Sequence, residues 1–80
     1  MKKVTIYSTP SCHFCHMAKD FFKEKGVEFE DFDVSVNLDK RKEMLEKSGQ
    51  MGVPVIIIDD KEIIVGFNKP KIVEVLGIKE

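Results

Sequence analysis

The stretch KVTIYSTPSCHFCHMAKDFF, residues 3–22, contains the first strand, a loop and the first helix that we predict for this chain. Residues 3–8 alternate in polarity, which is typical of a β-strand. A Thr-Pro-Ser sequence then favours a loop, and Ser11 or Cys12 stands where a helix is capped. Apolar side chains follow at helical spacing. The motif Cys12-His13-Phe14-Cys15 is therefore expected where a helix begins after a strand.

Strand and helix patterns continue to alternate along the rest of the chain. Residues 27–34, 53–58 and 62–65 predict three more strands, the last two joined by a tight turn at residues 59–61. Asn37 and Asn68 can cap two further helices. The resulting order, β-α-β-α-β-β-α, predicts an α/β domain in which helices pack on a sheet.

Helical spacing and composition also predict which apolar side chains form the core. The second helix is expected to turn three apolar residues inward, and the last helix another three: Leu38, Met44 and Leu45, then Ile72, Val73 and Leu76. A set of phenylalanines is expected inside the protein as well: Phe14, Phe21, Phe22, Phe29 and Phe32.

Composition indicates a small, charge-balanced protein. The chain has 80 residues, 42% of them hydrophobic, and a formal net charge of -1. Because no linker or repeat interrupts it, we predict a single domain over residues 1–80. The even mixture of charges gives no reason to expect nucleic acid or a membrane as a partner. No apolar run is long enough for a membrane span or a signal-peptide core, so we expect a cytoplasmic protein.

The two cysteines point to redox chemistry. A bridge between Cys12 and Cys15 would close a very small loop and add little stability, so a chemical role is favoured over a structural one. Thiol–disulfide exchange needs one thiolate that attacks and a second thiol that resolves the mixed disulfide. The positive end of a helix favours a thiolate on the earlier cysteine. Cys12 is therefore the predicted nucleophile and Cys15 the predicted resolving thiol.

Other readings of the same motif remain open at this point. Cys12 to His16 also spells the c-type haem attachment pattern, and the cysteines with His13 or His16 could supply part of a zinc site. An iron–sulfur cluster or metal shared by two chains is the alternative from a different class. His13 is expected near solvent, where its protonated form would favour the thiolate, or where it has no role. His16 is expected to be a solvated helix residue.

Four stretches of the sequence carry a resemblance to a known family: Ile6-Tyr7-Ser8, Cys12-His13-Phe14-Cys15, Ser48-Gly49-Gln50-Met51-Gly52-Val53-Pro54-Val55 and Val65-Gly66-Phe67-Asn68. Together they resemble the glutaredoxin-like branch of the thioredoxin-fold superfamily over essentially the whole chain. The resemblance implies a thioredoxin fold, a four-stranded mixed sheet with helices on both faces. It also implies a disulfide reductase in which Pro54 is cis and Val53 and Pro54 form a substrate platform beside Cys12. We expect a monomer with no bound cofactor.

Departures from the glutaredoxin pattern bear on substrate binding and on the electron donor. His13 and Phe14 replace the common Pro-Tyr, and Thr9 replaces a lysine that would meet a glutathione carboxylate. Gly66 and Phe67 instead look like the reductase-coupled redoxins that serve ribonucleotide reductase. His13, Phe14, Gly66 and Phe67 join Val53 and Pro54 as expected substrate-binding residues. Disulfide-containing proteins are the expected substrates. Thioredoxin reductase or glutathione is the expected electron donor, and the departures count against glutathione.

Overall fold

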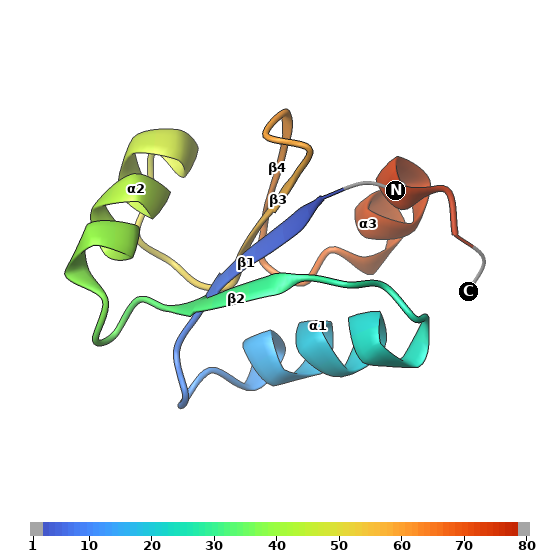
Figure 1. Ribbon diagram of the computed structural model, residues 1–80, viewed down its shortest axis with the longest axis horizontal. Coiled ribbons are helices and arrows are strands. Elements are labelled where there is room, and N and C mark those ends of the chain that lie inside the picture. The colour runs from blue at the N-terminus through green and yellow to red at the C-terminus, as the bar shows by residue number, and fades with distance from the viewer. Residues whose placement is uncertain (1–2, 79–80) are drawn as a thin grey trace.

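The computed structural model describes residues 3–78, so the first two and last two residues of the predicted domain lie outside the described part (Figure 1). Strands and helices alternate in the predicted order. Their bounds are β1 Val4–Ser8, α1 His13–Glu24, β2 Glu30–Asp33, α2 Leu38–Ser48, β3 Val55–Ile58, β4 Glu62–Val65 and α3 Lys69–Leu76. The helices start where the sequence predicts, because Cys12, Asn37 and Asn68 are their N-caps.

The four strands form one mixed sheet in the order β2-β1-β3-β4. β1 runs parallel to β2 and antiparallel to β3, and β3 runs antiparallel to β4. Ser8 is paired with Asp33, Tyr7 with Val55, and Val55 in turn with Val65. The last residues of β1, β2 and β4 therefore meet the first residue of β3 at one end of the sheet, and the loop to Cys12 leaves from this end.

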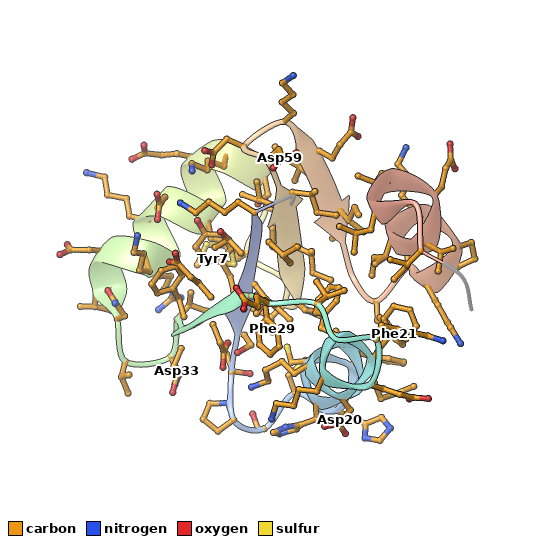
Figure 2. The ribbon with its side chains drawn as sticks, turned by 45° about the vertical axis from the view of Figure 1, so that its right-hand side comes forward. Tyr7, Asp20, Phe21, Phe29, Asp33 and Asp59 are labelled. Carbon is orange, nitrogen blue, oxygen red and sulfur yellow. The ribbon has the colours of Figure 1, made fainter. Side chains whose placement is uncertain are left out.

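Helices cover both faces of the sheet, as the thioredoxin fold requires. α1 and α3 pack on one face through a cluster that includes Phe22, Ile56 and Ile72, and α2 packs on the other through a cluster around Tyr7 and Met44. Figure 1 shows α2 apart from α1 and α3, and Figure 2 shows Tyr7 on the α2 side and Phe21 where α1 approaches α3. The predicted α/β architecture is confirmed.

Two predictions about the core of α2 are wrong. Met44 is 1% exposed, but Leu38 is 68% exposed and Leu45 is 42% exposed. Successive residues of a helix are rotated by about 100°, so Leu45 lies about 100° and Leu38 about 120° from Met44 on the same side of α2, and both are turned away from the sheet that Met44 contacts. Most of α2 is polar, and its contact with the sheet is correspondingly narrow.

The second strand and the first predicted core phenylalanine also differ from expectation. β2 spans Glu30–Asp33 rather than residues 27–34, because it is an edge strand that pairs with β1 over four residues. Val27 and Phe29 nevertheless pack against the core, as their alternation predicts. Phe14 is 58% exposed and not part of the core. It lies in the first turn of α1 and borders a hollow formed with residues 65–70. Among residues 3–78, no helix is long and apolar enough to cross a membrane.

Candidate active site

The loop between β1 and α1 brings the first cysteine to the end of the sheet. The backbone N–H of Cys12 donates to the carbonyl of Thr9 at 3.2 Å, and Nε2 of His16 lies 2.7 Å from the carbonyl oxygen of Pro10. Both contacts tie the loop to the first turn of α1. The sequence prediction of a solvated His16 is correct in that the residue is exposed, but it missed the contact with Pro10.

Cys12 occupies the N-cap of α1 with an extended backbone, φ -86° and ψ 111°. Its Sγ accepts a hydrogen bond from the backbone N–H of Cys15 at 3.2 Å, the role that a serine or aspartate oxygen plays at an ordinary N-cap. Cys12 is partly exposed. A negative charge on this sulfur would face the N–H of Cys15, which has no partner within the helix, and the positive end of the helix. The arrangement therefore suits an accessible thiolate.

Cys15 has opposite surroundings. It is 0% exposed, and burial, followed by its hydrogen bond with Cys12, raises the pKa of its thiol to about 12. A backbone hydrogen bond with Thr9 and the charge of Lys19 act in the other direction and lower that pKa. The net effect keeps Cys15 protonated at neutral pH. The two sulfurs are thus differentiated as one accessible and one buried thiol.

A polar group that the sequence analysis did not single out lies beside Cys15. Nζ of Lys19 is 3.0 Å from Oδ2 of Asp31, and the hydroxyl of Ser8 donates to Oδ1 of the same carboxylate at 2.6 Å. Ser8 is 2% exposed at the end of β1. The spacing of Lys19, one helical turn beyond Cys15, was a sequence signal that could have placed it near the thiol. Asp31 had no such signal, because its neighbourhood depends on the pairing of β1 with β2.

The predicted substrate-binding residues gather in two places. Phe14, Gly66 and Phe67 line a hollow of ≈ 540 Å³ between the first turn of α1 and the connection from β4 to α3. His13 is exposed, and its ring lies edge-on against Phe14 with centroids 5.8 Å apart. Phe67 is partly buried and contacts Phe21, with ring centroids 5.9 Å apart. The exposed ring of Phe14 and the partly buried ring of Phe67 thus line the hollow.

Val53 and Pro54 precede β3 at the same end of the sheet. The peptide bond between them is cis, as the resemblance implied, and Pro54 is buried. The carbonyl of Pro54 accepts a hydrogen bond from the backbone N–H of Gly66 at 2.8 Å, which joins this segment to the wall of the hollow. The side chain of Val53 packs against the cluster under α2. Any contact of Val53 with a substrate would therefore involve its backbone.

Residues 3–78 contain no group of three or more histidine, cysteine, aspartate or glutamate side chains placed to hold a metal ion. Cys12 and Cys15 supply two sulfurs, so a metal or cluster on them would draw further ligands from elsewhere, such as a second chain.

A sheet flanked by helices on both faces, with an accessible and a buried cysteine at the start of α1, defines a thiol–disulfide redox protein of thioredoxin fold. The chain belongs to the glutaredoxin family, whose family model matches residues 4–63.

Similar proteins agree with this assignment. A glutaredoxin-like 8.6 kDa protein from the rubredoxin operon of Clostridium pasteurianum is 48% identical over 69 residues, which cover 86% of this chain and 91% of that protein. A mutant of the thioredoxin-like protein BC3987 superposes with a TM-score of 0.91 at 33% identity, covering 99% of this chain and 100% of the other. The glutaredoxin-like NrdH-redoxin of Escherichia coli superposes with a TM-score of 0.78 at 27% identity, covering 98% of this chain and 99% of that one. That protein is described as having a thioredoxin-like activity profile.

Proposed function

We propose that this protein is a dithiol disulfide reductase in which Cys12 attacks the substrate and Cys15 resolves the mixed disulfide. The observation that carries the proposal is the difference between the two sulfurs. Cys12 is partly exposed and its Sγ accepts the backbone N–H of Cys15, whereas Cys15 is fully buried with a pKa raised to about 12 by burial. A thiolate is the nucleophile in this exchange, and the accessible sulfur is the one that a substrate can reach.

The reaction then has two exchange steps. The Cys12 thiolate forms a bond to one sulfur of the substrate disulfide, and the other substrate sulfur leaves as a thiolate that takes up a proton. Cys15 next loses its proton and attacks Sγ of Cys12, which breaks the mixed disulfide and releases the second substrate thiol. The substrate gains two electrons, and the protein keeps a Cys12–Cys15 disulfide that a donor must reduce.

The hollow beside the cysteines suits a segment of a protein substrate. Phe14 and Phe67 present apolar surface. The backbone N–H and carbonyl of Val53, next to the cis bond to Pro54, are the polar groups proposed to bind an extended segment of the substrate. His13 would lie at the rim. Glutathione carries two carboxylates, and Thr9 supplies no positive charge to meet one of them. Disulfide-containing proteins are therefore the proposed substrates, reduced in the cytoplasm.

Thioredoxin reductase is the proposed electron donor. The absence of a lysine at Thr9 and the Gly66-Phe67 sequence both support a donor other than glutathione. The similarity to NrdH-redoxin, whose activity profile is described as thioredoxin-like, supports the same choice.

One set of assays tests the reaction and the donor together. The oxidised protein is offered NADPH with thioredoxin reductase or, separately, glutathione with glutathione reductase, and insulin reduction is followed. We expect faster reduction with the first pair, loss of activity in Cys12→Ser, and accumulation of a mixed disulfide in Cys15→Ser. Activity that survives in Cys12→Ser would refute the proposed nucleophile. Purified protein that is brown and carries stoichiometric iron would instead support the cluster-binding alternative.

A further inference from the structure

His16 contacts the active-site loop through two of its groups. Its backbone N–H donates to the carbonyl of Cys12 at 3.3 Å, and its side-chain Nε2 is 2.7 Å from the carbonyl oxygen of Pro10. Because a carbonyl oxygen only accepts hydrogen bonds, Nε2 must carry the proton in this contact, whether the ring is neutral or charged. One residue of α1 therefore binds the loop on both sides of Ser11.

This contact completes a set of bonds between the loop and the first turn of α1. The N–H of Cys12 donates to the carbonyl of Thr9 at 3.2 Å, and the backbone of Thr9 is hydrogen-bonded to the thiol of Cys15. The extended backbone of Cys12 places its Sγ 3.2 Å from the N–H of Cys15. The position of the attacking sulfur thus depends on a short loop whose Pro10 carbonyl is bonded by an imidazole.

We propose that His16 is a positioning residue: its Nε2–H bond to the Pro10 carbonyl holds the loop so that Sγ of Cys12 stays within hydrogen-bond distance of the N–H of Cys15. The inference rests on the proposed function, because it takes Cys12 as the attacking sulfur. His16 does not touch the substrate in this role. It acts through the loop by stabilising the geometry in which the helix end favours the thiolate.

The test compares three variants in a Cys15→Ser background, where Cys12 is the remaining cysteine. His16→Leu removes the donor, and His16→Gln keeps an amide N–H of similar reach. Asp20→Leu is the control, an exposed residue one turn further along α1. The rate of Cys12 alkylation by iodoacetamide at pH 7 is measured for each. His16→Leu should slow it by about two- to tenfold, the range expected for one net hydrogen bond, and His16→Gln should restore most of the rate.

A second readout uses the same substitutions with both cysteines present. The reduction potential against glutathione buffers should become more negative in His16→Leu, because the reduced form loses stabilisation, and should return towards the original value in His16→Gln. Unchanged alkylation in His16→Leu, or a loss that glutamine does not restore, would overturn the inference. Alkylation needs no disulfide substrate, so this outcome is separate from a failure of the proposed function, which is seen as reductase activity in Cys12→Ser.

Discussion

Cys12 and Cys15 are three residues apart, yet their surroundings differ in exposure and in hydrogen bonding. Cys12 takes the cap position, where its sulfur accepts a hydrogen bond from a backbone N–H. Cys15 is the third residue of the helix and is fully buried. The backbone N–H of Cys15 favours charge on the first sulfur. The side-chain contact with Cys12 disfavours charge on the second, because it adds to burial in raising the pKa of Cys15. The proposed order of the two exchange steps rests on this difference.

Lys19 should affect the second step and leave the first unchanged. Its positive charge lowers the pKa of Cys15, against the larger effect of burial. In Lys19→Met that charge is lost, so deprotonation of Cys15 becomes harder and the release of substrate from the mixed disulfide should slow by about two- to fivefold, the range for a partly exposed charge pair. Stopped-flow decay of a preformed mixed disulfide measures this step.

The control for Lys19 is Lys23→Met, one helical turn further from Cys15 and exposed. It should release substrate at the original rate. The attack step, followed in a Cys15→Ser background, should be the same in both variants. If Lys19→Met slowed attack and release equally, its effect would be general and the assignment to Cys15 would be wrong.

The turn between β3 and β4 contains two aspartates whose backbone conformation is one that glycine adopts more readily. Asp59 and Asp60 both have positive φ, 55° and 57°, and the N–H of Lys61 donates to the carbonyl of Ile58 at 3.1 Å. Asp59 is fixed by a hydrogen bond from the N–H of Lys3 to its carboxylate. Asp60 has a weaker constraint, an ion pair with Lys47 at 3.6 Å on an exposed side chain.

Asp60→Gly should therefore stabilise the protein. Glycine reaches positive φ without steric cost, and the loss of one exposed ion pair removes little. We expect the free energy of unfolding to rise by about 0.5–1 kcal/mol, less than the full left-handed penalty because glycine also gains freedom in the unfolded chain. Urea denaturation measures the change. Asp60→Ala is the matched control and should destabilise, because it loses the same ion pair and keeps the strained backbone.

At the level of elements, the sequence predicts best where the signal is local. Capping side chains set the starts of all three helices, and Asn37 and Asn68 were recognisable from their type and position. The length of β2 depends on how many of its residues pair with β1. The exposure of Leu38 and Leu45 depends on how much of α2 the sheet covers. Periodicity says which side chains share a face, but not how much of that face the sheet covers.

At the level of the whole molecule, the site is made by strand order. The cysteine pair could be predicted because it is contiguous, and Gly66 and Phe67 could be proposed from resemblance. The hollow itself joins Phe14 to the connection after β4, about fifty residues away in sequence, so it depends on where the sheet places β4 relative to α1. The contacts of Lys19 with Asp31 likewise depend on the parallel pairing of β1 and β2.

The buried thiol of Cys15 and the buried phenol of Tyr7, one on each face of the sheet, make the stability of the fold depend on pH. Cys15 is a buried residue of α1, and Tyr7, in β1, lies under α2. Burial raises the pKa of Tyr7 to about 12. The negative charge of Glu43 and the hydrogen bond that its carboxylate accepts from the Tyr7 hydroxyl act in the same direction. Glu43 keeps its own pKa below the usual range mainly through a hydrogen bond from Lys40, so it is charged where Tyr7 titrates. Both Cys15 and Tyr7 are therefore held protonated by the folded state.

Stability should consequently fall in alkali, and more so for the reduced protein. Each pKa is higher in the folded state than in the unfolded chain, from 9.0 for Cys15 and from 10.0 for Tyr7 to about 12, so the stabilisation is complete below the unfolded value and is lost as pH rises towards 12. In the oxidised protein Cys15 belongs to the disulfide and has no thiol to titrate, so this contribution to the pH dependence of stability is lost. Urea denaturation at pH 8 to 11 should give a steeper fall for reduced than for oxidised protein, and Tyr7→Phe should flatten both curves. Parallel curves for the two redox states would show that Cys15 is not the buried, protonated thiol on which the order of the exchange steps depends.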